Sequence, residues 1–332
     1  MARDPGKLSD RPWSGGVEIA AADAMEGTGV RRALEGVDVA YYLIHSLGTG
    51  ASFEQRDRDA AGIFADAAMS AGVKRIVYLG GIVPGDGSGL SPHLRSRAEV
   101  GDILLAGGVL TAALQAAVII GSGSASFEML RYLTERLPVM VTPKWVGTRI
   151  QPIAVHDVLR YLVGCAALPP DVSRRFDIGG PDVLTYAEMM RRYSRVAGLR
   201  PRVLRSSAAA HTAALIAVGR AGDAGAESSL AMPLVESLRN EVVCSEHDIA
   251  AYVPDPPEGL AAPRPCHRLG PAAHPRGRSL HPLVIGRHAR RSQRPASQRP
   301  VVGRRLAVCG RTHQCRPRFA RGTVAGHRGH RR

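Results

Sequence analysis

The segment from Val73 to Glu99 constrains the fold more than any other part of the chain. It opens with a short run of apolar and β-branched residues, Arg75 to Leu79, whose length and composition are typical of a buried parallel strand. Gly80 and Gly81 end this run, and a loop rich in Gly, Pro and Ser leads to Ser91-Pro92, where a helix can begin. Ligands of open α/β sheets bind beyond the carboxyl ends of the strands. We therefore expect the two glycines and the start of the helix to face a bound ligand.

Other segments repeat this alternation of strand and helix. Residues 37–45 form a second buried apolar run, and residues 109–121 contain a third. Between the first two lies Phe53 to Ala71, which carries apolar residues at helical spacing and is followed by Gly72, a suitable C-terminal cap. Strands that alternate with helices predict an α/β fold with a doubly wound parallel sheet.

Two later motifs complete a family resemblance. Residues 150–158 read IQPIAVHDV, and residues 176–181 read FDIGGP and lead to Thr185 and Glu188, the spacing of a capping box. Together with residues 37–45 and 73–80, they resemble the short-chain dehydrogenase/reductase superfamily, in its atypical or extended NAD(P)H-binding branch (NmrA-like or complex I accessory subunit-like). The resemblance covers about residues 2–200 and resumes at 233–258. It implies a Rossmann-type sheet with a smaller α-rich C-terminal lobe.

The same resemblance implies that part of the cofactor site precedes the sequence. In this superfamily a Gly-x-x-Gly-x-x-Gly turn between the first strand and helix presents backbone amides to the pyrophosphate. No such turn precedes Arg3. We expect a sheet that lacks its first βαβ portion, with impaired cofactor binding and exposed strand edges.

Six residues are candidates for cofactor binding. By resemblance, Arg3 lies where an arginine meets the 2′-phosphate, which favours NADP(H) over NAD(H). Asp23, after a short strand expected over residues 16–20, lies where an Asp contacts the adenine. The alternatives are a solvated loop arginine and a turn aspartate. His45 and Ser46 follow the strand that begins at Val37 and would line the cleft, His45 as a cleft or capping residue rather than a catalyst. Gly80 and Gly81 complete the set.

The catalytic candidates are His93 and Arg97. In the superfamily the corresponding helix carries a Tyr-x-x-x-Lys pair, and here that spacing falls on His93 and Arg97. A histidine can donate or accept a proton near neutral pH, whereas an arginine cannot replace a lysine that lowers the pKa of a tyrosine. His93 would be the proton donor and Arg97 an electrostatic clamp. The alternative is a polar pair at the start of a helix.

Charge is distributed unevenly along the 332 residues. Eighteen of the 44 Lys and Arg follow Glu258, where no Asp or Glu occurs, so the first 258 residues carry 26 basic and 29 acidic residues. The excess of +15 therefore gives no evidence for specific nucleic-acid binding, although the tail can bind polyanions non-specifically. We find no signal peptide or membrane span and expect a cytoplasmic protein with an unknown small-molecule substrate. The oligomeric state is open.

We divide the chain into five segments: an incomplete NAD(P)-binding domain (1–122), a substrate-side lobe that continues the fold (123–205), an Ala/Gly-rich linker or out-of-frame segment (206–231), a helical remainder of the lobe (232–258) and a disordered Arg/Pro/His-rich tail (259–332). The tail reads as out-of-frame sequence or as a polyanion-binding arm. Its Cys309, His313 and Cys315 do not match a common zinc pattern, and we predict no metal site.

Three functions follow from these observations. The first is an NAD(P)H-dependent oxidoreductase or epimerase-like enzyme that acts on a small organic substrate. The second is a non-catalytic NAD(P)H-binding regulator or accessory protein, since the Tyr-Lys pair is absent. The third is a truncated or frameshifted chain without function.

Overall fold

The computed structural model describes residues 1–44, 53–85, 89–121, 124, 127, 130–131, 134–135, 139–142, 144–199, 202–205, 239–262 and 306–310. His45 and Ser46 lie outside the described residues, as do the segment 206–231 and most of the tail. The side chains of 139–145, 202–205 and 306–310 also lie outside the description.

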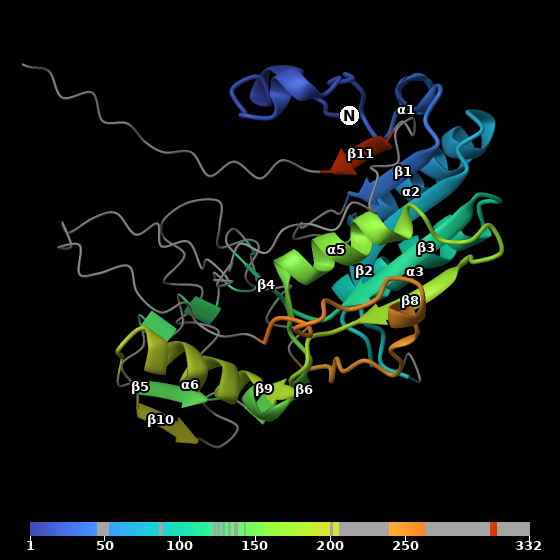
Figure 1. Ribbon diagram of the computed structural model, residues 1–332. Helices are drawn as coiled ribbons and strands as arrows, with labels where there is room; N and C mark the ends of the chain where they lie inside the picture. Colours follow the sequence, from blue (N-terminus) through green and yellow to red (C-terminus); the bar gives the residue numbers. More distant parts are fainter. Residues whose placement is uncertain are drawn as a thin grey trace, which may run out of the picture.

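A five-stranded parallel sheet forms the centre of the molecule (Figure 1). Its strands, in spatial order, are β11 (Leu306–Gly310), β1 (Val39–Leu43), β2 (Arg75–Gly81), β3 (Leu110–Ala116) and β8 (Arg174–Ile178). Every neighbouring pair is parallel. The Rossmann-like α/β fold expected from the sequence is confirmed. The sheet extends beyond residues 1–122, because β8 comes from the following segment.

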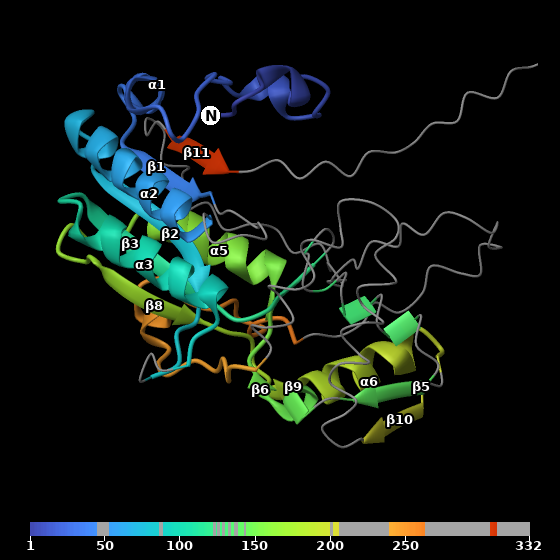
Figure 2. The ribbon, with the colours of Figure 1, turned by 180° about the vertical axis from the view of Figure 1, so that it is seen from behind.

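Helices cover both faces of this sheet (Figure 2). On one face α1 (Gly27–Leu34), α2 (Phe53–Ser70) and α3 (Pro92–Ala106) pack on strand residues such as Tyr42 and Tyr78. On the other face α5 (Val155–Cys165) packs on Tyr41, Val77 and other residues of the same strands. The strands β1, β2 and β3 thus alternate their side chains between two apolar cores, which explains their nearly continuous apolar sequences.

Smaller elements surround the sheet. Two-stranded pairs are formed by β5 (Val139–Thr142) with β10 (Arg202–Arg205), by β4 (Ile119–Ile120) with β7 (Ile153–Ala154), and by β6 (Arg149–Ile150) with β9 (Leu184–Thr185). Helix α6 (Tyr186–Val196) has the expected capping box of Thr185 and Glu188. The 3-10 turns are η1 (Pro5–Lys7), η2 (Ser14–Gly16), η3 (Lys144–Gly147) and η4 (Asp248–Ala251). In the described part of the chain, no helix is long and apolar enough to cross a bilayer.

Two elements differ from the sequence prediction. The strand expected over residues 16–20 is wrong: Gly16 is the last residue of η2, residues 17–20 form neither helix nor strand, and only the next residue, Ala21, forms an isolated parallel bridge with Ala2. A five-residue strand needs a partner along its length, and Ala2 offers one residue. The helical remainder expected at 232–258 is also wrong in its described part, residues 239–258. Apart from η4 that part is irregular, and Pro254, Pro256 and Pro257 disfavour a helix there.

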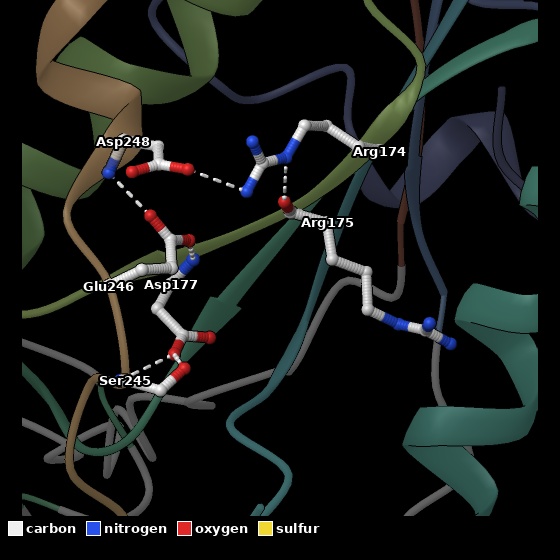
Figure 3. Close-up of polar contacts among 6 residues, drawn as sticks. All are labelled: Arg174, Arg175, Asp177, Ser245, Glu246 and Asp248. Atoms are coloured by element: carbon white, nitrogen blue, oxygen red, sulfur yellow. Dashed lines mark hydrogen bonds and ion pairs between the residues drawn. The ribbon is translucent and has the colours of Figure 1, made fainter.

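The irregular segment covers the outer edge of β8 instead (Figure 3). The Glu246 carboxylate accepts a hydrogen bond from the backbone N–H of Asp177 at 2.6 Å, and the Asp177 carboxylate accepts from both the backbone and the hydroxyl of Ser245 at 2.8 Å. Arg174 forms an ion pair with Asp248 at 2.8 Å. A carboxylate of the covering segment thus accepts a hydrogen bond from an amide of β8, and a carboxylate of β8 accepts one from an amide of the covering segment. The covering segment therefore protects this edge of the sheet from pairing with another chain.

The opposite edge holds an unexpected strand. The sequence predicts a tail without structure and an exposed edge where the first strand of the superfamily is missing. Five residues of that tail, Leu306–Gly310, pair in parallel with Val39–Leu43 as β11. The edge of β1 is therefore paired in this structure.

Candidate functional site

The candidate site lies where β1 and β2 end and α3 begins. Because the strands are parallel, Leu43 and Gly81 lie at the same edge of the sheet. The helix α3 starts at Pro92 with Ser91 as its N-cap, whose hydroxyl accepts a hydrogen bond from the Leu94 amide, as the sequence predicts. A Cβ atom on Gly81 would lie 3.0 Å from a methyl group of Leu94. The absence of a side chain there allows the end of β2 and the first turn of α3 to approach closely.

Arg97 joins the ends of the two strands. Its guanidinium group donates one hydrogen bond to the carbonyl of Ile44, just after β1, at 3.4 Å and another to the carbonyl of Leu79 in β2. The same group lies over the Tyr78 ring, 5.1 Å from the ring centroid. The residue at the lysine position thus binds the backbone. Its planar fork suits two separated acceptors in a way that an ammonium group does not.

Tyr78 is a site residue that the sequence analysis missed. It is 2% exposed, and its hydroxyl donates to the carbonyl of Arg97 at 2.9 Å. Burial raises the pKa of Tyr78, and the positive charge of Arg97 opposes this shift only in part. The phenol is therefore a neutral structural donor that fixes α3 on β2. Tyr78 and Arg97 are far apart in sequence, and the apolar strand pattern gave no sign that they meet.

His93 is half-buried in the first turn of α3. Burial and, to a smaller extent, the nearby charge of Arg97 lower the pKa of His93 from its usual 6.5 to about 4. The imidazole is consequently neutral near pH 7. The structure differs here from the expectation of a histidine that titrates near neutrality, because desolvation disfavours the charged form.

This shift predicts how stability depends on pH. Since the pKa of His93 is lower in the folded than in the unfolded chain, the unfolded chain binds more protons between about pH 4 and 6.5. The contribution of His93 to the free energy of unfolding is therefore complete above pH 6.5 and falls, by about 3 kcal/mol, as the pH falls to 4. His93→Gln should flatten this part of the curve in urea unfolding measured from pH 4 to 8. An unchanged slope would contradict the prediction.

The described candidate residues form two separate groups in the structure. Gly80, Gly81, His93 and Arg97 gather around the end of β2, whereas Arg3 and Asp23 follow the bridge between Ala2 and Ala21. Arg3 is exposed, and no ion pair of Arg3 occurs within the described residues. The Asp23 carboxylate accepts a hydrogen bond from the Met25 amide at 3.0 Å, which is the turn role considered above.

One described residue fits part of a nicotinamide dinucleotide: the exposed Arg3, next to a parallel bridge, can receive a phosphate. Gly80 and Gly81 are instead packed against protein side chains, because a Cβ atom on them would lie 2.9 Å from Tyr78 and 3.0 Å from Leu94, respectively. A glycine-rich turn that could hold the diphosphate does not occur in the described ranges. The arrangement as a whole is that of an α/β protein with a parallel sheet, a class in which ligands bind beyond the carboxyl ends of the strands.

Comparisons with known proteins agree with this class. Residues 1–124 match a family model described as NAD(P)H-binding. Three solved structures share the fold. A nucleoside-diphosphate-sugar epimerase from Staphylococcus aureus has a TM-score of 0.58 at 16% identity, with 76% of this chain and 85% of that chain covered. A Citrobacter sp. triphenylmethane reductase complexed with NADP(H) has a TM-score of 0.58 at 15% identity, with 76% and 84% covered. An NADPH-dependent quinone oxidoreductase from Escherichia coli, complexed with NADPH, has a TM-score of 0.58 at 18% identity, with 76% and 83% covered.

No curated protein matches the chain significantly in sequence. The family model over residues 1–124 and the shared fold nevertheless agree with the resemblance to the superfamily that the sequence suggests. The chain shares the Rossmann-like α/β fold of these three structures, and its residues 1–124 match the NAD(P)H-binding family.

Proposed function

We propose that the protein is an NADPH-dependent reductase for an electron-poor, conjugated small molecule such as a quinone. The observation that carries this proposal is the state of the pair at the Tyr-x-x-x-Lys spacing. His93 is neutral with a pKa of about 4, and the guanidinium of Arg97 binds two backbone carbonyls. Neither group is a ready proton donor to a carbonyl oxygen. This is a change from the role of proton donor that the sequence suggests for His93.

The chemistry of the acceptor follows from this pair. The cofactor, when bound, supplies a hydride. A simple ketone that accepts hydride becomes an alkoxide, which needs a proton donor in the site. A quinone becomes a delocalised phenolate, which water can protonate, so that one quinone, one NADPH and one proton give one hydroquinone and one NADP⁺. Two proteins of the same fold are, by their names, a quinone oxidoreductase and a triphenylmethane reductase, and both names fit an acceptor of this kind.

NADPH oxidation at 340 nm tests the proposal. We expect turnover with 1,4-benzoquinone and little with a panel of aldehydes and ketones. His93→Gln should leave the quinone rate within about twofold, because neutral His93 donates no proton to the product. Turnover of a ketone that disappears in His93→Gln would contradict the proposal and restore His93 as the acid.

Arg3 supports a preference for NADP(H). Its exposed guanidinium can form a bidentate contact with a 2′-phosphate that NADH lacks. We expect Arg3→Glu to weaken NADPH binding by about tenfold or more while NADH binding changes less than twofold, measured by cofactor fluorescence. Arg11→Glu, a nearby exposed arginine, is the matched control. Equal losses for both cofactors would argue against this role.

A second candidate is a non-catalytic NAD(P)H-binding protein. The bonding of Arg97 to Ile44 and Leu79 favours it, because a group that holds the backbone is not free to clamp a reacting oxyanion. NADPH binding without turnover on the quinone and carbonyl panels would select this function. We expect weak binding, since no glycine-rich turn for the diphosphate occurs in the described residues. An absence of binding would support the third reading, a chain without function.

A further inference from the structure

We propose that Leu306–Gly310 is an integral strand of the central sheet, which it closes along the outer edge of β1, and that cofactor binding depends on it. The second half of this statement rests on the proposed function. The first half, that residues 306–310 belong to the sheet, is independent of the proposed function. It gives part of the basic tail a structural role, which neither an out-of-frame tail nor a polyanion-binding arm would have.

The pairing of β11 with β1 is the first argument. It runs in register over five residues, from Val39 opposite Leu306 to Leu43 opposite Gly310, and it is parallel like every other pair in the sheet. The strand β11 thus matches β1 in length and direction.

The second argument is the environment of β1. Val39, Ala40, Tyr41 and Tyr42 are between 0% and 7% exposed, and two apolar cores cover the two faces of the strand. Backbone N–H and C=O groups in such a strand need partners, because an unpaired buried polar group costs free energy. Residues of β2 satisfy one edge only. The other edge therefore requires a strand, and β11 supplies it.

The third argument is the sequence of the tail. Leu306-Ala307-Val308-Cys309 is an uninterrupted apolar run without proline, bounded by Arg304-Arg305 before it and Arg311 after Gly310. A short apolar run is what a parallel strand buried on both faces requires. Residues 263–305 provide a connection long enough to reach the opposite edge of the sheet from β8.

The position of Gly310 links the strand to the cofactor. Gly310 pairs with Leu43 at the carboxyl end of β1, next to Ile44, whose carbonyl binds Arg97. Ligands of doubly wound sheets bind at this edge. A glycine at such a position adds no side chain between the backbone and a ligand.

Hydrogen–deuterium exchange of the full chain tests the strand without a cofactor. We expect amides of residues 306–310 to exchange at least tenfold more slowly than those of 311–332. Equal exchange rates in the two segments would overturn the proposal, and this measurement requires no substitution.

A double substitution gives the second test. Successive amides of a strand point to opposite sides, so one of the two amides at residues 307 and 308 points toward β1. Proline has no N–H group, and the double variant Ala307→Pro with Val308→Pro therefore removes one donor from the pairing with β1, whichever residue provides it. Residues 39–43 should then lose protection at least tenfold while 110–116 in β3 keep theirs. The matched control is Thr323→Pro with Val324→Pro. Unchanged protection of 39–43 would contradict the proposal.

Cofactor titration completes the experiment. We expect the 307/308 variant to bind NADPH at least tenfold more weakly than the wild type and the 323/324 control to bind like the wild type. Equal affinity in the 307/308 variant would overturn the dependence on β11. If the wild type itself binds no NADPH, the proposed function and this dependence both fail, whereas the exchange result still decides whether β11 is part of the sheet.

Discussion

Replacing Arg97 with Met should weaken NADPH binding by at least tenfold and lower the free energy of unfolding by about 2 kcal/mol. The guanidinium donates to the carbonyls of Ile44 and Leu79 and lies over Tyr78. Without it, the ends of β1 and β2 lose a common donor at the edge where the ligand is expected. Methionine keeps most of the apolar contact with the ring, so the loss reports mainly on the hydrogen bonds.

Two further variants separate the role of Arg97 from a simple effect of charge. Arg97→Lys keeps the charge, but a lysine ammonium cannot reach both carbonyls in the same plane, and we expect it to recover less than half of the lost stability. Arg95→Met removes an exposed arginine from the same helix and should change neither quantity measurably. Full recovery by Arg97→Lys in urea unfolding and fluorescence titration would show that charge alone matters.

Replacing Arg75 with Met should lower the free energy of unfolding by about 3 kcal/mol. Arg75 is 4% exposed at the first position of β2. Its guanidinium donates to the carbonyls of Val172 at 2.8 Å, Leu168 at 3.3 Å and Pro169 at 2.7 Å, all in the loop between α5 and β8. The substitution leaves these acceptors without the arginine in a place that water reaches poorly.

The neighbouring residue is the control for this prediction. The Lys74 side chain is 78% exposed and forms an ion pair with Asp38 at 2.6 Å. Exposed pairs of this kind contribute little, so Lys74→Met should cost less than 1 kcal/mol. Urea unfolding of both variants at pH 7 measures the difference. Similar losses for the two substitutions would mean that the three carbonyl contacts of Arg75 are not important for stability.

Local sequence patterns account for most of the strands, helices and caps that were predicted correctly. The apolar runs at residues 37–45 and Arg75 to Leu79 became β1 and β2, with β2 continuing through the two glycines to Gly81, and Ser91-Pro92 began α3. Gly72 has a positive φ of 72° after α2, as a C-terminal cap often does. Each of these features depends on residues within a few positions of one another. At residues 16–20 the sequence pattern predicted a strand, but no strand among the described residues pairs with this segment, and the strand did not form.

The candidate site was predicted less completely. Spacing placed His93 and Arg97 on the first turns of α3, close to Gly80 and Gly81, and the structure has them there. Spacing could not show that Arg97 binds backbone carbonyls or that Tyr78 lies beneath it, since these contacts join different elements. It also could not reveal the burial that lowers the pKa of His93.

The sequence by itself determined the class of fold and the helix caps, because apolar periodicity, glycine and capping residues act through neighbours in the chain. Only the tertiary structure decided which groups meet: Arg75 with the loop before β8, Glu246 with the amide of Asp177, and β11 with β1. The physical reason is the need to satisfy buried polar groups. Which distant residue satisfies them depends on where the packed chain brings it, and local sequence does not contain that information.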